Sequence, residues 1–293
     1  MIALYSIGTS FVALCCSSFI SFSQTLDSAT AFSGVNERVR YYRSSFELKS
    51  VTLVMHGLNV RPEAMMPLIN WLTQHGSDVY LIRLTGHTTD PPSISEITSQ
   101  AWLDETMNGY QIARHAATRD SVPLFFLGYS LGALLGQIII SRYDAVVDRQ
   151  VLIAPATAIR DRSYLLKFMF LFSENRILPS YTPAQVRANK GLPIKIYKIL
   201  FGLSKDLVKA RFDKVNIPTL TIVDPRDELV SYRKLRRHKR KYNLTEHQII
   251  KLDTDLNGRS TKYHHLIISE PTMGETNWRT ASASMAKFLF ANE

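Results

Sequence analysis

Residues 124–137, LFFLGYSLGALLGQ, place a serine between two apolar runs, with a glycine two positions to either side. The run before the serine is typical of a buried strand, and the run after it is typical of a buried helix. A sharp turn between them crowds the backbone around Ser130, which favours the glycines found at Gly128 and Gly132. The stretch therefore predicts either a tight turn with a spare serine or a turn that holds Ser130 out as a nucleophile.

The chain on both sides of this stretch alternates between strand-like and helix-like segments. The expected strands are residues 50–57, 78–87, 122–129, 149–156, 217–224 and 246–253, and the expected helices are residues 62–76, 100–119, 131–143 and 277–292. Strands that alternate with helices pair in parallel through right-handed crossovers, and continuously apolar strands are covered on both faces. We therefore predict an α/β fold, a mostly parallel central sheet with helices on both faces and its site at the carboxyl ends of the strands.

One interval, residues 157–218, breaks this alternation. It contains the apolar segments YLLKFMFLF (164–172) and KIYKILFGL (195–203), so it is too long for a single crossover and too apolar for a loop. We predict a helical cap insertion at about residues 158–212, laid over the strand ends. Additional crossover helices in the core are the alternative.

The N-terminal segment differs in composition from the rest of the chain. The first 26 residues contain no charged side chain, and both cysteines, Cys15 and Cys16, lie among them. We predict a signal peptide or N-terminal anchor at residues 1–23, a connector at 24–36 and a domain at 37–293, hence an exported protein that is periplasmic, secreted or membrane-anchored. A cytoplasmic location remains the alternative, since no Lys or Arg opens the segment. Without further cysteines, the domain has no disulfide framework, thiolate metal site or cysteine nucleophile.

The net charge of +10 comes partly from one run, RKLRRHKRKY, at residues 233–242. We interpret the run as a solvated helix face; contact with an anionic membrane is the alternative. No nucleic-acid-binding motif accompanies it, so no nucleic acid is expected as a partner. The oligomeric state stays open.

A serine nucleophile needs a base, and the base needs an acid that orients it. The segment TLTIVDPRDELVS (219–231) offers Asp224 at the end of a strand and Asp227 in the loop that follows. We prefer Asp227, because Leu229 and Val230 can pack and fix its loop, whereas Asp224 is placed to cap the turn.

The base is expected after the last strand, in YHHLIISEP (263–271). His265 directly precedes an apolar run that can anchor it, so we prefer it over His264. The oxyanion N–H donors would be Leu131, at the start of the helix after Ser130, and Leu58, after the strand at 50–57. His56 is interpreted as a residue that stabilises the turn.

Five blocks occur in an order that resembles α/β-hydrolases. They are LVMHGLN (53–59), RLTGH (83–87), GYSLGA (128–133), DPRDELV (224–230) and HHLIISE (264–270). Together with AWLDETMNGYQ (101–111) they are most similar to bacterial carboxylesterases and monoacylglycerol lipases, over residues 48–292. One departure is Thr88, where the family usually has a third glycine.

This resemblance implies Ser130 as nucleophile, Asp227 as acid, His265 as base, and the N–H groups of Leu58 and Leu131 as the oxyanion hole, without a cofactor or metal. It implies hydrolysis of carboxylic esters through an acyl-enzyme. The apolar cap favours a small-molecule or lipid ester, such as a monoacylglycerol or lysolipid, and the basic surface favours peripheral membrane contact. The alternatives are a thioesterase, acyltransferase or peptidase on the same residues, or a binding protein that kept the fold.

Overall fold

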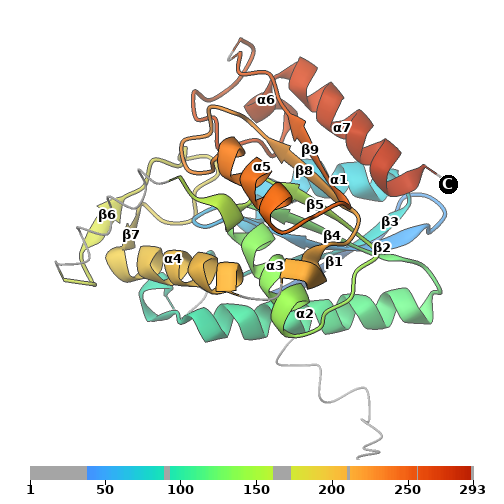
Figure 1. Ribbon diagram of the computed structural model, residues 1–293, viewed down its shortest axis with the longest axis horizontal. Coiled ribbons are helices and arrows are strands. Elements are labelled where there is room, and N and C mark those ends of the chain that lie inside the picture. Colours follow the sequence, from blue (N-terminus) through green and yellow to red (C-terminus); the bar gives the residue numbers. More distant parts are fainter. Residues whose placement is uncertain (1–37, 89–92, 161–172, 210–211, 256, 292–293) are drawn as a thin grey trace, which may run out of the picture.

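The computed structural model describes residues 38–88, 93–160, 173–209, 212–255 and 257–291, and all structural statements concern these residues. The predicted signal peptide or anchor (1–23) and the connector (24–36) lie outside them. Seven described strands form the central sheet in the order β1-β3-β2-β4-β5-β8-β9 (Figure 1). They are β1 (Val39–Tyr42), β2 (Ser50–Met55), β3 (Ser77–Ile82), β4 (Leu124–Tyr129), β5 (Arg149–Ile153), β8 (Thr219–Val223) and β9 (His247–Lys251).

Helices cover both faces of this sheet, and the predicted α/β fold is confirmed (Figure 1). They are α1 (Met66–Gln74), α2 (Ser99–Arg119), α3 (Leu131–Arg142), α4 (Ile194–Lys209), α5 (Tyr232–Lys241), α6 (Glu270–Met273) and α7 (Glu275–Phe290). Among the described residues, no helix combines the length and apolar character that a membrane crossing requires.

The two faces of the sheet carry separate hydrophobic cores. In β4, Phe126 packs with residues of α2 and α3, whereas its neighbours Phe125 and Leu127 pack with residues of α1 and α7. Successive side chains of a strand point to opposite faces, so a strand covered on both sides needs apolar residues throughout. This double burial explains the continuous apolar runs in the sequence.

The first strand, β1, was not among the predicted strands. It pairs antiparallel with β3 at the edge of the sheet, and Arg40 and Tyr41 are exposed. An edge strand of four residues with one buried side chain has no apolar run to signal it. Asp78 of β3 fixes the edge by accepting hydrogen bonds from the Tyr41 hydroxyl and the Ser44 N–H, each at 2.7 Å.

The insertion predicted at about residues 158–212 is only partly described, because residues 161–172 and 210–211 lie outside the described ranges. In its described part, β6 (Ile177–Pro179) pairs antiparallel with β7 (Gly191–Pro193) before α4 begins. The described part of the insertion thus combines the helix α4 with a two-stranded hairpin that the sequence analysis did not predict. A proline in each strand is poorly compatible with a helix interior and is tolerated in the edge strands of a short hairpin.

Candidate active site

The turn between β4 and α3 holds Ser130 in a strained conformation. Its φ of 50° and ψ of −108° lie outside the regions that non-glycine residues prefer. A Cβ on Gly128 would lie 2.6 Å from the Ala133 Cα, and one on Gly132 would lie 2.6 Å from the Met55 carbonyl oxygen. Glycine at both positions is thus what permits the turn, as the sequence pattern predicts.

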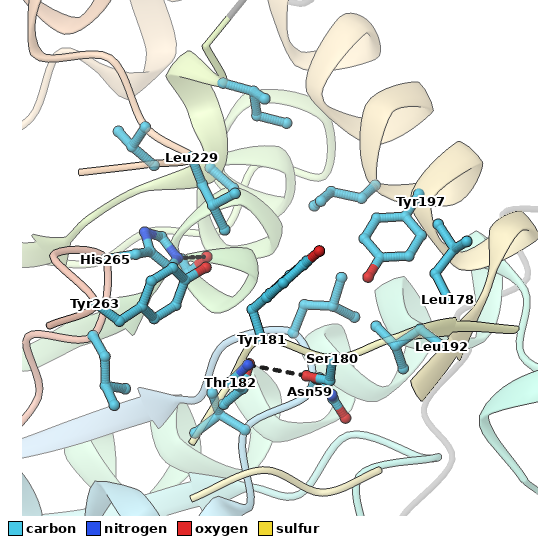
Figure 2. Close-up of a pocket in the computed structure, with 18 of the residues that line it drawn as sticks. Asn59, Leu178, Ser180, Tyr181, Thr182, Leu192, Tyr197, Leu229, Tyr263 and His265 are labelled. Carbon is cyan, nitrogen blue, oxygen red and sulfur yellow. Dashed lines mark hydrogen bonds between the residues drawn. The ribbon is translucent and has the colours of Figure 1, made fainter. Parts of the chain in front are cut away.

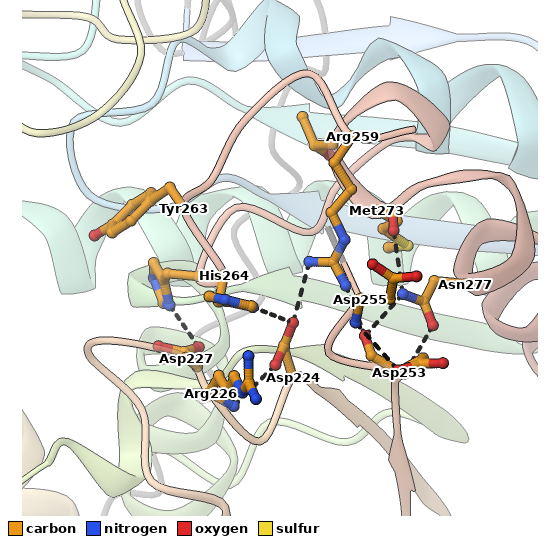
Figure 3. A network of polar contacts seen from close by, with 12 residues as sticks. Asp224, Arg226, Asp227, Asp253, Asp255, Arg259, Tyr263, His264, Met273 and Asn277 are labelled. Atoms are coloured by element: carbon orange, nitrogen blue, oxygen red, sulfur yellow. Dashed lines mark hydrogen bonds and ion pairs between the residues drawn. The ribbon is translucent and has the colours of Figure 1, made fainter. Parts of the chain in front are cut away.

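Ser130, His265 and Asp227 form one hydrogen-bonded series. The Ser130 Oγ lies 2.9 Å from the His265 Nε2, and the His265 Nδ1 lies 2.8 Å from the Asp227 Oδ2 (Figures 2 and 3). With neutral imidazole, Nδ1–H donates to the carboxylate and Nε2 accepts the serine proton. Asp227 is fully buried, which strengthens its interaction with the imidazole. The structure therefore brings the three preferred residues together.

The loop that carries Asp227 is fixed by polar contacts. The Asp227 Oδ1 accepts the N–H groups of Leu229 and Val230, at 2.7 and 2.8 Å. The Arg160 guanidinium donates to the carbonyl oxygens of Asp227 and Pro225, at 2.5 and 2.8 Å. The sequence predicted packing by Leu229 and Val230. Val230 is buried, whereas Leu229 is 38% exposed, and both residues orient the carboxylate through their backbone N–H groups.

The alternative residues, Asp224 and His264, pair with each other. The His264 Nδ1 lies 2.8 Å from the Asp224 Oδ2, and the same oxygen accepts Arg259 Nη1 at 3.1 Å (Figure 3). The side chains of Asp224 and Arg259 are fully buried. Their network ties the loop after β9 to the end of β8, next to the Ser130 series but separate from it.

Glu228 is a site residue that the sequence analysis missed. Its two carboxylate oxygens accept the backbone N–H groups of His264 and His265, at 3.1 and 3.0 Å. Of these two adjacent acids, Asp227 therefore holds the imidazole of His265, and Glu228 holds the backbone of His264 and His265. Their adjacency in DPRDELV was the only available signal.

The two expected oxyanion donors are Leu131, which directly follows the serine, and Leu58. Leu131 is the first residue of α3, whose first-turn N–H groups have no acceptor within the helix. Leu58 lines the same cavity as Ser130. His56 supports this loop: its Nδ1 lies 2.9 Å from the Gly57 carbonyl oxygen, and its Nε2 accepts the Leu84 N–H at 3.1 Å.

The electrostatic state of His56 follows from these partners. Because Nε2 accepts a backbone N–H, the ring is a neutral Nδ1–H tautomer. Burial lowers the pKa of His56 to about 4. The ring is therefore a structural link between two loops.

The loop after β2 is also joined to the insertion. The Asn59 Nδ2 donates to the Ser180 Oγ at 2.8 Å (Figure 2), and the Arg61 N–H donates to the Val186 carbonyl oxygen at 2.8 Å. Both Leu58 and Asn59 line the cavity. The insertion therefore contacts the segment that contains Leu58, a candidate oxyanion donor.

A cavity of about 460 Å³ lies over Ser130 and His265 (Figure 2). Its lining is largely apolar, with tyrosines among the polar groups: Leu58, Val60, Tyr129, Ala156, Ile159, Leu178, Pro179, Tyr181, Leu192, Tyr197, Leu200, Phe201, Leu229, Val230, Tyr263 and Leu266. Burial raises the pKa of Tyr197, and burial together with nearby Asp227 raises that of Tyr263, so both phenols are neutral. No Asp or Glu is among the described lining residues, and in the described ranges no three His, Cys, Asp or Glu side chains are grouped to hold a metal.

Comparisons with known proteins agree with this architecture. The family model described as Serine aminopeptidase, S33 (Hydrolase_4) matches residues 47–193. No curated protein matches the chain.

Solved structures of lipolytic enzymes share the fold. A soluble variant of monoglyceride lipase from Saccharomyces cerevisiae is 10% identical, with a TM-score of 0.68 over 86% of this chain and 90% of that chain. One of the metagenome-derived lipolytic enzymes LipS and LipT is 20% identical, with a TM-score of 0.64 over 85% and 97%. Monoacylglycerol lipase from Paleococcus ferrophilus is 18% identical, with a TM-score of 0.60 over 85% and 99%. At these identities the likeness is one of fold.

Proposed function

The chain belongs to the α/β-hydrolase family described as Serine aminopeptidase, S33, and we propose that it hydrolyses carboxylic esters through an acyl-enzyme. The observation that carries the proposal is the hydrogen-bonded series Ser130–His265–Asp227 at the floor of a largely apolar cavity. A hydroxyl, an imidazole and a buried carboxylate in this order are the groups that acyl transfer requires.

In the proposed reaction, the Ser130 Oγ attacks the ester carbonyl carbon while the His265 Nε2 takes the hydroxyl proton. Asp227 stabilises the resulting imidazolium, and the N–H groups of Leu58 and Leu131 stabilise the oxyanion. The carbonyl re-forms, the C–O bond to the alcohol breaks, and His265 gives its proton to the leaving oxygen. Water then attacks the acyl-enzyme, with His265 as base, and releases the carboxylic acid and free Ser130.

The cavity favours an uncharged ester with an apolar acyl group, such as a monoacylglycerol or a lysolipid. Apolar walls bind an acyl chain by removing it from water, and the neutral phenols of Tyr197 and Tyr263 can hydrogen-bond a polar headgroup. Two proteins with the same fold are monoacylglycerol lipases, which supports this choice.

Aminopeptidase activity is the second candidate, because it is the activity in the family's description. An aminopeptidase has to bind the ammonium group of its substrate, and a carboxylate in the cavity would do so. The lack of Asp and Glu among the described lining residues favours an ester over a peptide with a free N-terminus. Thioester hydrolysis and acyl transfer would use the same three side chains, so only a comparison of substrates distinguishes them from ester hydrolysis.

The test is turnover by wild type and Ser130→Ala, with Ser282→Ala in α7 as the matched control. We expect wild type and the control to hydrolyse acyl esters faster than thioesters and aminoacyl amides, and Ser130→Ala to lose activity. A fluorophosphonate should label Ser130 in the wild type. Ester turnover that survives in Ser130→Ala would refute the mechanism, and preference for aminoacyl amides would refute the substrate.

Export and membrane contact are also part of the proposal. Residues 1–23 are uncharged and largely apolar, which supports an export signal or an anchor. The mass of the mature N-terminus tests this: loss of about 23 residues or an added lipid supports export, and an intact unmodified chain in the cytoplasm contradicts it.

A further inference from the structure

The helix α5 presents arginines along one side. Seven of its ten residues are Lys or Arg, and Leu235 is its one buried residue among those described. The positions of Arg233, Arg236, Arg237 and Arg240 are related by steps of three and four, so their side chains share one face of the helix. These four residues are here called the arginine face.

The arginine face lines a hollow on the surface. The hollow has a volume of about 710 Å³ and is lined by Arg160, Ser231, Arg233, Lys234, Arg236, Arg237 and Arg240. All four arginines of the face are exposed, and no carboxylate of the described residues forms an ion pair with them. Like charges that converge on one concavity repel one another, and an anionic ligand relieves this repulsion.

This hollow adjoins the candidate active site. Arg160 lines it and also holds the backbone of the Asp227 loop. Ile159 lines both the substrate cavity and a second hollow, of about 350 Å³, that Arg237 shares. The loop that carries Asp227 joins β8 to α5, and its residue Val230, which lines the substrate cavity, directly precedes the Ser231 N-cap of the helix.

The chemistry of the hollow fits phosphate groups. Guanidinium binds a phosphate through two parallel N–H donors, and several guanidiniums in one concavity can hold more than one phosphate. Single-stranded nucleic acid would also need aromatic side chains on which bases stack, and none is among the described residues that line this hollow. A phospholipid headgroup has no bases to stack, so it needs no aromatic side chain.

Exposed apolar side chains near the substrate cavity point to the same partner. Leu229, 38% exposed, and Tyr181, 87% exposed, both line the cavity, and Ile177 in the adjacent hairpin is 65% exposed. We propose that the arginine face binds the phosphates of anionic phospholipids and holds the enzyme at a membrane surface, with its cavity beside the lipid. The choice of lipid as the source of phosphate rests on the proposed ester substrate.

The experiment measures binding of the full chain to sedimented vesicles of phosphatidylcholine, with and without phosphatidylglycerol. The test variant replaces the four arginines of the face by glutamine. The control variant makes the same change in net charge at four exposed cations elsewhere in the chain: Arg43, Lys49, Lys251 and Lys287. Turnover of a water-soluble short-chain ester is measured in parallel, because it tests the proposed function without a membrane.

For the wild type, phosphatidylglycerol should increase vesicle binding, and added salt should reverse the increase. In the test variant this increase in vesicle binding should fall by about 100-fold or more, since each cation near an anionic surface contributes about fivefold, less for cations held away from it. The control variant should lose much less, and soluble-ester turnover should change little in either. Inorganic phosphate should compete only weakly, because it offers one phosphate at a time.

Three results would overturn the proposal: no increment with phosphatidylglycerol, equal loss in both variants, or tighter binding to an oligonucleotide at the same phosphate concentration. Loss of soluble-ester turnover in Ser130→Ala with vesicle binding intact is expected. If the wild type binds vesicles but does not hydrolyse the soluble ester, the proposed function is wrong and the proposed membrane contact still stands.

Discussion

The side-chain amide of Asn59 pairs with the peptide groups of Asn189 in both directions. Its Nδ2 donates to the Asn189 carbonyl oxygen at 3.0 Å, and its Oδ1 accepts the Asn189 N–H at 2.8 Å. Asn59 is nearly fully buried and has a φ of 58°, a region that asparagine tolerates better than most residues. The insertion therefore holds the residue next to Leu58 in a defined place.

We expect Asn59→Asp to lower kcat by about tenfold, because a misplaced oxyanion donor loses part of an effect worth about 10²–10³ when a donor is removed. Aspartate keeps the shape and the backbone conformation but replaces the donor that faces the Asn189 carbonyl. The measurement is kcat and KM on a short and a long acyl ester. Ser180→Ala, which removes one partner of Asn59 and leaves the Asn189 pair, should have a smaller effect; an equal effect would argue against the role of the pair.

Asp227→Asn and Asp224→Asn should fail in different ways. Asparagine at 227 can keep the Oδ1 contacts but presents N–H₂ to His265 and selects the wrong tautomer, so we expect kcat to fall by about 10⁴-fold. At 224 it leaves the buried Arg259 without a counter-charge, so the free energy of unfolding should fall by about 3–5 kcal/mol.

Urea denaturation and ester turnover, measured on both variants, separate the two effects. If Asp224→Asn were as inactive per folded molecule as Asp227→Asn, the assignment of the acid would be wrong.

Acid should destabilise the protein through His56. Its pKa in the folded state, about 4, lies below the unfolded value of about 6.5, so between these pH values the unfolded chain binds the proton first. The stabilisation is present above pH 6.5 and is lost as pH falls towards 4. Between pH 7 and pH 5 this amounts to about 2 kcal/mol of unfolding free energy.

Comparison of His56→Gln with wild type, by urea denaturation at both pH values, measures this contribution. The variant should be less stable at pH 7 and should show a pH dependence that is flatter by about 2 kcal/mol. His115→Gln, at an exposed position of α2, should keep the wild-type slope. A slope unchanged in His56→Gln would contradict the explanation.

Alanine should have opposite effects at two glycines. At Gly132 the new methyl would lie 2.6 Å from the Met55 carbonyl oxygen, so β2 and α3 must separate; we expect a loss of about 1–3 kcal/mol in stability and at least about tenfold in kcat. At Gly202, inside α4, the space around the added methyl is open. Alanine there should stabilise the protein by about 0.5–1 kcal/mol. Thermal unfolding and turnover check both, and a harmless Gly132→Ala would show that the turn can relax.

The sequence predicted six strands of the sheet. Five of them, β2, β3, β4, β5 and β8, are buried on both faces, which leaves an apolar run that is visible without a structure. The sixth, β9, is partly exposed and has only Ile249 and Ile250 as apolar residues. It did not predict β1, β6 or β7, which are short and contain polar residues or proline; β1 and β6 are also partly exposed.

The three residues that the sequence analysis preferred, Ser130, Asp227 and His265, lie within hydrogen-bonding distance of one another in series. Which histidine pairs with which aspartate could be seen only in the structure. His264 and His265 are adjacent in the chain, and their side chains point in different directions, one to Asp224 and the other to Asp227.

The supporting residues Glu228, Arg160 and Asn59 share a reason for having been missed. Each makes its contacts with backbone groups of segments far away in the chain: the separations are 37 residues for Glu228 with His265, 67 for Arg160 with Asp227 and 130 for Asn59 with Asn189. A backbone acceptor or donor exists at nearly every position, so the identity of the partner leaves no trace in the sequence.

The hydrogen bond between Ser130 and His265 spans 135 residues of chain. A contact this remote forms only after most of the sheet has assembled, because closing so large a loop costs entropy before other contacts repay it. During refolding from urea, helical circular dichroism should thus recover ahead of ester turnover. Regain of activity is accordingly a kinetic marker for completion of the native topology.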